Sequence, residues 1–293
     1  MRDSSAGAGD REPLRKLGSG GEHRTPRGRH DSGTKPTSST GVSVDEMLAA
    51  DTIGYEPVGL VTGSSVFEIP LAGRRAYYKM NMEVTAFTYG LHQARIAAIR
   101  KMRSQTIGLK ADGVVGSHFG LPSIPRDGSE VRFTVTGTAM RAKKDAVIQP
   151  RPDSRENPFT STLSGQDFAL LGRAGYLPLG IVMGVCVFHV GRRHVATTIK
   201  DLPGNEELSV ITEALYESRE LAMFRMQEEA TALEAHGIVG VTIEEKTHAW
   251  GSRVMEFLAL GSAVELVADT YQPLGPALLV QLSDKVDTSS LAD

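Results

Sequence analysis

The side chains best suited to chemistry in this sequence are two pairs of arginines. A Gly-Arg-Arg triplet occurs twice, as Gly73-Arg74-Arg75 and as Gly191-Arg192-Arg193. Two guanidinium groups in one loop can hold a phosphate or a carboxylate through paired hydrogen bonds. The candidates for binding a small anion are therefore Arg74, Arg75, Arg192 and Arg193. The alternative interpretation is a solvated turn that merely recurs.

A site for a soft metal ion would need Cys, His or Met side chains that converge on one point. Cys186 is the only cysteine, and His189 follows it three residues later. We expect both in one strand, where alternating side chains point to opposite faces, so the pair would be a poor chelate. His118 is a third weak candidate. A single cysteine also excludes a disulfide or a Cys-rich metal site within one chain.

Other sequence features argue against an enzyme and against a nucleic-acid binder. The chain lacks the patterns Gly-x4-Gly-Lys-Ser/Thr, Gly-x-Ser-x-Gly and His-Glu-x-x-His. Its net charge of −3 and its 6% aromatic content are unlike those of a general nucleic-acid binder. We therefore expect a non-enzymatic protein that does not bind nucleic acid.

The N-terminal segment differs from the rest of the 293-residue chain. Gly, Pro, Ser and Thr supply 20 of its first 40 residues, and eight Lys and Arg face five Asp and Glu. Such a segment buries too little apolar surface to offset its ordering entropy, so we predict a disordered basic tail over residues 1–49. Residues 1–40 could contact protein partners. Without a secretory signal or an apolar span of membrane length, the expected location is the cytoplasm.

Internal similarity is the most informative feature of the sequence. Residues 53–69 and 174–190 share seven residue types at an offset of 121, namely those of Gly54, Tyr55, Pro57, Gly59, Gly63, Val66 and Phe67. Farther along, the offset becomes 124 and ten more types recur, those of Arg95, Met102, Leu109, Ala111, Gly113, Val115, Gly116, Phe133, Gly137 and Ala139. Two blocks in the same order predict a duplicated domain.

Each copy predicts the element order β-α-β-β. A glycine-studded strand (58–69 or 179–190) precedes a long helix with apolar residues at steps of three and four. We expect Gly113 and Gly237 to end these helices with positive φ. Strands at 131–140 and 254–264 should then pair with the strand before them as a hairpin. The predicted fold class is α+β, with the helix packed on an antiparallel sheet in two layers.

The predicted boundaries are repeat 1 at 50–143, a flexible linker at 144–169, repeat 2 at 170–268 and a C-terminal tail at 269–293. The repeat signature consists of ten glycines that shape the backbone at strand bends and helix ends: Gly59, Gly63, Gly113, Gly116, Gly137, Gly180, Gly184, Gly237, Gly240 and Gly261.

The segments GLVTG, AxGxVGV and GTAM or GSAV together resemble the YbjQ-like family, whose members are often named heavy-metal-binding domain proteins. The resemblance implies a β-α-β-β fold and a homo-oligomeric ring, usually a pentamer. With two copies per chain, we expect a five-fold ring or two stacked rings. A metal cofactor is implied by the family name alone. The expected function is a non-enzymatic, ring-forming binding protein for a metal ion or small anion. The alternative is a structural scaffold whose tails recruit protein partners.

Overall fold

The computed structural model describes residues 39–69, 81–120, 129–190, 209–247 and 254–268. The helices are α1 (Val44–Thr52), α2 (Thr85–Gly108), α3 (Gly165–Arg173) and α5 (Ser209–Ala232). The strands are β1 (Tyr55–Glu68), β2 (Met82–Glu83), β3 (Gly113–Phe119), β4 (Glu130–Ala142), β5 (Phe159–Thr160), β6 (Tyr176–His189), β7 (Gly237–Thr247) and β8 (Val254–Leu266). We call residues 39–142 the first half and residues 159–268 the second half.

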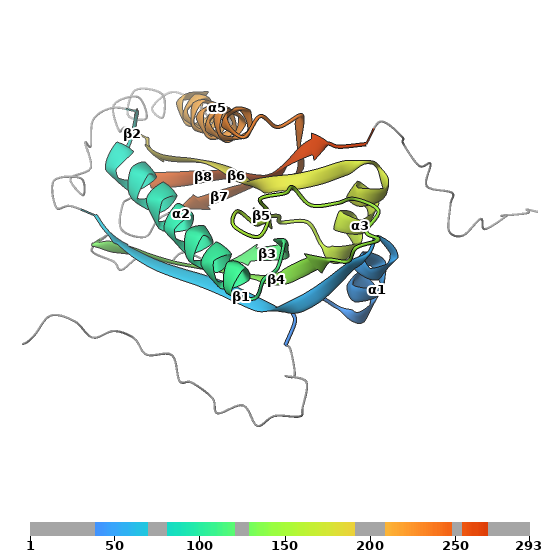
Figure 1. Cartoon of the computed structure of the whole chain (residues 1–293). Helices are drawn as coiled ribbons and strands as arrows, with labels where there is room; N and C mark the ends of the chain where they lie inside the picture. The colour runs from blue at the N-terminus through green and yellow to red at the C-terminus, as the bar shows by residue number, and fades with distance from the viewer. Residues whose placement is uncertain (1–38, 70–80, 121–128, 191–208, 248–253, 269–293) are drawn as a thin grey trace, which may run out of the picture. The chain divides into compact units, whose positions relative to one another are not determined.

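Two four-stranded sheets form the frame (Figure 1). Sheet A has the order β1-β4-β3-β5, and sheet B has the order β2-β6-β8-β7. The pairs β3–β4 and β7–β8 are antiparallel, which confirms the predicted hairpins. The fold is α+β, as predicted. The two short strands cross between halves: β2 of the first half pairs with β6, and β5 of the second half pairs with β3.

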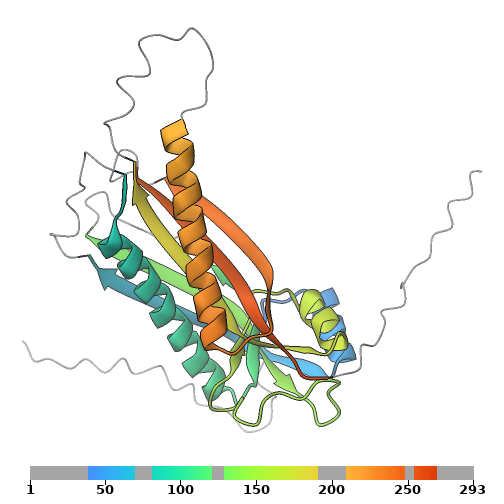
Figure 2. The same ribbon diagram turned by 90° about the horizontal axis from the view of Figure 1, so that it is seen from above.

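The layers follow from how α2 and α5 pack. One apolar cluster joins the inner face of sheet A and helix α2 to one face of sheet B, from which Met183, Val185 and Leu258 contribute. The other face of sheet B packs on α5 through Val182, Cys186 and related side chains. Figures 1 and 2 show α5 over sheet B and α2 along the side where the two sheets meet. Strands β6 and β8 of sheet B are thus buried on both faces, which fits the nearly continuous apolar sequence of β6.

Glycines permit the close approach of helix to strand. A Cβ atom on Gly63 would lie 1.9 Å from the carbonyl oxygen of Ala98 in α2, and one on Gly184 would lie 1.8 Å from that of Ala222 in α5. Real side chains never approach backbone so closely, so both positions require glycine. The predicted strand irregularities also occur, between Pro57 and Gly59 and at the corresponding place in β6.

The ends of the long helices differ from the prediction. Gly113 and Gly237 begin strands β3 and β7 and have no positive φ. Instead, Lys110 (φ 54°) and Glu234 (φ 56°) adopt the left-handed conformation, and the next amide donates back into the last helical turn, from Ala111 to the Thr106 carbonyl and from Ala235 to that of Ala230. This C-terminal motif closes each helix before the glycine is reached.

Two short helices occupy segments predicted as tail and linker. Helix α1 begins at Val44, inside the range 1–49, where Ser43 and Glu46 form a reciprocal capping box. Strand β5 and the start of α3 lie inside the range 144–169. Phe159 and Phe168 are buried there, and the ring of Phe168 meets that of Tyr55 edge to face at 5.0 Å. These residues are packed rather than a flexible linker, because their few apolar side chains fill a cluster between the halves.

Within the described residues, no helix has both the length and the apolar character needed to cross a membrane.

Candidate functional site

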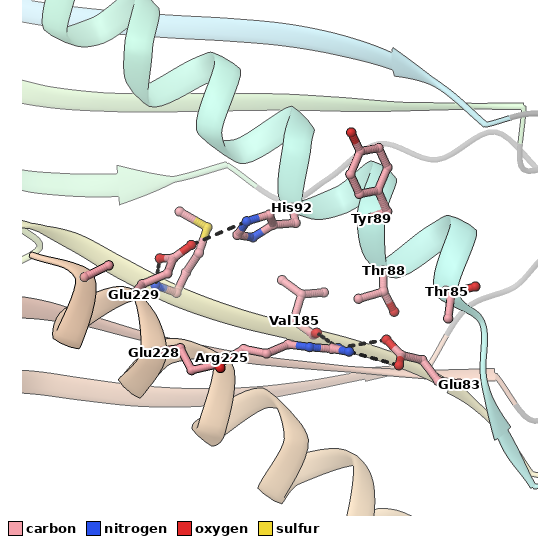
Figure 3. A pocket seen from close by; sticks show the side chains of 11 residues that line it. Glu83, Thr85, Thr88, Tyr89, His92, Val185, Arg225, Glu228 and Glu229 are labelled. Carbon is pink, nitrogen blue, oxygen red and sulfur yellow. Dashed lines mark hydrogen bonds and ion pairs between the residues drawn. The ribbon is translucent and has the colours of Figure 1, made fainter.

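The strongest candidate site is a cavity of about 460 Å³ between α2 and α5, floored by β6 (Figure 3). Both halves of the chain line it. The first half supplies Glu83, Thr85, Thr88, Tyr89 and His92, and the second half supplies Met183, Val185, Arg225, Glu228, Glu229 and Ala232. The cavity therefore exists only where the two halves meet.

One end of the cavity is closed by a bidentate ion pair. Arg225 donates from Nη1 to Glu83 Oε1 at 2.7 Å and from Nη2 to Glu83 Oε2 at 3.0 Å. Its Nη1 also donates to the Val185 carbonyl at 2.7 Å. The hydrogen bonds to Glu83 raise the pKa of Arg225, so this residue remains a cation. The pair fixes β2 against α5 and leaves little net charge at this end of the cavity.

The other end holds His92 and Glu229, and Figure 3 shows them facing each other across the cavity. His92 Nε2 lies 3.4 Å from Glu229 Oε1, and the Met183 amide donates to Glu229 Oε2 at 2.8 Å. Burial, with help from Arg95 and Arg225, lowers the pKa of His92. Burial also raises the pKa of Glu229, although the Met183 hydrogen bond opposes that rise. At neutral pH the imidazole is therefore uncharged beside a partly desolvated carboxylate.

A second cavity of about 340 Å³ adjoins the first, because both are lined by Met183, Glu229 and Ala232. Arg103 lines this second cavity, and burial lowers the pKa of that guanidinium. The two cavities together follow the seam between the helices.

The lining of the first cavity combines an apolar floor with acidic side chains. Met183, Val185 and Ala232 give it an apolar floor. Arg225 is neutralised by Glu83, so Glu228 and Glu229 leave an excess of negative charge. Such a lining would accept a small molecule that has an apolar body and a positive or hydrogen-bond-donating end.

The predicted metal candidates Cys186, His189 and His118 do not line this cavity. Arg74, Arg75, Arg192 and Arg193 fall outside the described residues. Cys186 is buried against α5, whereas the alternation of β6 puts His189 on the opposite face, and His118 is exposed on β3. Within the described part of the chain, no three His, Cys, Asp or Glu side chains group as they would around a metal ion.

The signature glycines serve the backbone. Gly116 and Gly240 have φ of 61° and 62°, and each lies at the register shift of its strand, β3 or β7. A side chain on Gly137 or Gly261 would collide with Val114 or Ile238 across the hairpin. None of these positions offers a chemical group, so they shape the sheets that carry the site.

Sequence reasoning missed Glu83, His92, Arg225 and Glu229. One signal was present: Lys101 and Gln105 stand 124 residues before Arg225 and Glu229. The structure gives both pairs the same bonds. Lys101 Nζ donates to the Ser64 carbonyl as Arg225 does to Val185, and Gln105 accepts from the Thr62 amide as Glu229 does from Met183. In both long helices a basic residue is followed four positions later by a hydrogen-bond acceptor, at the offset of 124 residues. This recurring pair could have indicated the site.

Comparisons with known proteins identify the family of this chain. A family model described as "Putative heavy-metal-binding" matches residues 173–267. A protein named "Encapsulin nanocompartment protein Rv1762c" from Mycobacterium tuberculosis is 36% identical over 227 residues, which cover 76% of this chain and 84% of that relative. A UPF0145 protein of Thermotoga maritima is 39% identical over 90 residues, 30% of this chain and 81% of its own. A UPF0145 protein of Helicobacter hepaticus is 37% identical over 95 residues, 32% of this chain and 88% of its own. On the evidence of this family model and these relatives, the chain belongs to the YbjQ-like family, also called UPF0145.

Proposed function

We propose that this protein is a non-enzymatic binding protein that carries two copies of one domain and assembles head to tail into rings. One observation carries the proposal: strands β1 of sheet A and β6 of sheet B correspond, but only β6 is covered on both faces. On sheet A, Leu60 and Val66 are 50% and 62% exposed. The corresponding residues on sheet B, Ile181 and Val187, are 8% and 0% exposed because α2 covers them.

Duplication of the domain is supported by details that chance would not repeat. Helices α1 and α3 both have nine residues, stand 121 positions apart and begin after a serine cap, Ser43 or Ser164. The bonds of Lys101 and Gln105 recur at Arg225 and Glu229. We therefore place the start of each copy before its short helix, near residues 39 and 160, earlier than the boundaries at 50 and 170 predicted from the sequence.

Head-to-tail association follows from the layer order sheet A, α2, sheet B, α5. The outer face of sheet A and the outer face of α5 lie at opposite ends of this order and differ from each other. Within the chain, the corresponding surfaces of α2 and sheet B already pack together. A contact between two different surfaces leads to a closed ring or to an open filament, according to the rotation between copies. The expected five-fold ring or stacked rings would be the closed outcome. The relative's name, an encapsulin nanocompartment protein, points to assembly as well.

The cavity between α2 and α5 would be the binding site. Its charge favours a cation with an apolar body over the small anion that the arginine triplets indicate. A resident heavy-metal ion does not fit the described residues, since no three of their His, Cys, Asp or Glu side chains group as they would around a metal ion. The lining also pairs its His with the carboxyl group of Glu229. A reduced cysteine is compatible with the cytoplasm.

Native mass spectrometry of the full chain, combined with elemental analysis, tests the assembly. The expected result is a complex of several chains without a stoichiometric heavy metal. A monomer at micromolar concentration would overturn the assembly, and one bound metal ion per chain would overturn the assignment of the ligand.

Isothermal titration with two probes of equal size tests the cavity. Phenylethylamine carries a cation and phenylacetate an anion on the same apolar body. We expect only the amine to bind, and we expect Glu229→Gln to weaken it. Preference for phenylacetate would contradict the proposed ligand class.

A further inference from the structure

A buried ion pair shows how one copy of the domain meets the next. Arg95 on α2 donates from Nη2 to Glu256 Oε1 on β8 at 2.5 Å, across the junction between the halves. Counting on by 124 residues leads from Arg95 to Arg219 on α5, and counting back by 124 leads from Glu256 to Arg132 on β4. The Arg132 side chain is 63% exposed, and Arg219 is exposed as well. The corresponding surfaces of this chain are therefore open.

Around Arg219 the second half has a cavity, whereas the corresponding place in the first half is filled. The cavity measures about 370 Å³ and lies between α5, β7 and β8, with Leu215, Tyr216, Arg219, Ile243 and Glu245 in its lining. At the corresponding place between α2 and β4, the Arg95 guanidinium lies over the Phe133 ring at 5.3 Å and meets Glu256. The residue corresponding to Phe133 is Phe257, which lines the cavity too.

We propose that this cavity receives Glu130 and Arg132, on β4, from a second copy of the chain. The proposal rests on the head-to-tail assembly above and names the residues of its second, interchain contact. It also names the partner, which is the outer face of sheet A.

Charge complementarity favours this occupant. The residue that corresponds to Glu256 is Arg132. An exact repeat of the intrachain contact between two chains would therefore place Arg132 of one chain beside Arg219 of the other. Two changes compensate. Glu130 Oε1 accepts a hydrogen bond from Arg132 Nε at 2.8 Å and lies 2.6 Å from its Nη2, so a carboxylate would reach Arg219. Glu245 lines the cavity, so a second carboxylate would reach Arg132. The result is two alternating ion pairs in place of the single buried one.

Other side chains near the outer face of sheet A fit the same contact. Lys101 on α2 donates to the Ser64 carbonyl of β1 as Arg225 does to that of Val185, and it is exposed. Leu60 and Val66 provide exposed apolar area on the face that α5 of the second copy would cover. Thr62 and Thr134 replace the Met183 and Leu258 of sheet B. The interchain contact is thus more polar than the intrachain one, as expected of copies that must meet from solution.

A charge exchange tests the contact by native mass spectrometry and sedimentation of the full chain. Arg132→Glu and Glu245→Arg should each raise the dissociation constant of the assembly at least tenfold. The double variant pairs two glutamates with two arginines and should restore association. Lys144→Glu, which reverses an exposed charge on the loop after β4, is the matched control and should leave association unchanged. Circular dichroism should show unaltered thermal unfolding, since both substituted side chains are at the surface.

Each outcome is decisive. If the unaltered chain is a monomer, the proposed assembly itself fails. If the chain assembles but Arg132→Glu has no effect, or if the double variant does not recover, the assembly stands and the contact proposed here is wrong.

Discussion

Arg95 Nη2 and Glu256 Oε1 lie 2.5 Å apart, and each of the two side chains is only 2% exposed. Residues 161 positions apart in the sequence thus meet in the core, one on α2 and the other on β8. Within the described residues, Nε and Nη1 of Arg95 have no hydrogen-bond partner, and the face of the guanidinium lies over Phe133. The pair fixes the register between the two halves of the chain.

Removing one partner of this pair should be more harmful than removing both. Arg95→Met alone breaks a buried ion pair from one side, which costs about 3–5 kcal/mol in the free energy of unfolding. Arg95→Met combined with Glu256→Leu removes both charges and should recover most of that loss. Urea unfolding followed by circular dichroism gives the double-mutant cycle. Purely additive losses would show that the two side chains do not depend on each other.

Alanine at Gly184 should be destabilising, because its Cβ would overlap the Ala222 carbonyl oxygen of α5. The helix would have to move away from β6, and we expect a loss of about 3 kcal/mol, the upper range for overpacking. Gly63→Ala should behave alike in the first half. Gly108→Ala is the matched control: a Cβ there meets nothing within 4 Å, and alanine should stabilise the helix by about 0.5–1 kcal/mol. Thermal unfolding of the three variants distinguishes these effects, and equal losses would refute the close-packing argument.

His92 should make the protein sensitive to mild acid. Burial holds the pKa of the folded imidazole below its ordinary value of 6.5. As the pH falls below 6.5, the unfolded chain binds a proton that the folded chain does not, so the free energy of unfolding decreases. The decrease ends once the folded imidazole is protonated as well. Urea titrations across this range should show that His92→Gln removes this part of the loss and that His118→Gln, at an exposed position, does not. Parallel curves for wild type and His92→Gln would contradict the prediction.

Glu229 should make the free energy of unfolding depend on pH in the direction opposite to His92, and Glu229→Gln should remove that dependence. Because burial raises the pKa of Glu229 above its ordinary value of 4.5, the folded state is favoured below pH 4.5 and loses that advantage as the pH rises through the folded pKa. Glutamine can still accept from the Met183 amide, just as Gln105 accepts from Thr62. The variant should therefore gain stability over wild type at neutral pH, and the gain should vanish toward pH 4.5. A variant that is less stable at neutral pH would show that the carboxylate is needed.

Cys186 should be unreactive in the folded protein. Its side chain is fully buried, and burial, reinforced by Glu83, raises the thiol pKa to about 12. A disulfide reagent such as DTNB attacks through the thiolate, so at about pH 8 we expect no labelling of native protein and complete labelling in concentrated urea. Rapid labelling without denaturant would mean that β6 opens readily.

The main elements were predictable because their signals are local. The stripes of α2 and α5, the hairpins β3–β4 and β7–β8 and the strand irregularities near Gly59 and Gly180 each depend on residues close in sequence. The helix ends were misplaced because Lys110 and Glu234, rather than glycines, take the left-handed conformation. Helices α1 and α3 were missed because nine residues give too few turns for a clear apolar period.

The candidate site was harder to predict, because it depends on which surfaces meet. Glu83 and Arg225 are 142 positions apart, and neither residue type indicates its partner. Their contact requires that β2 cross to sheet B, and a two-residue strand leaves no pattern in the sequence. The anion candidates were predicted because the Gly-Arg-Arg triplet occurs twice. A repeated motif indicates shared ancestry as readily as shared chemistry.

Strands β2 and β5 each complete the sheet of the opposite half of the chain. The peptide between the halves therefore keeps the two surfaces of that junction at an effective concentration of about millimolar, the range of short tethers. The UPF0145 relatives match only about a third of this chain. A protein with one domain must form every junction by collision, at a rate that depends on its concentration. In the proposed ring, every second junction here would form as a first-order step during folding, so dilution would act on only half of the contacts.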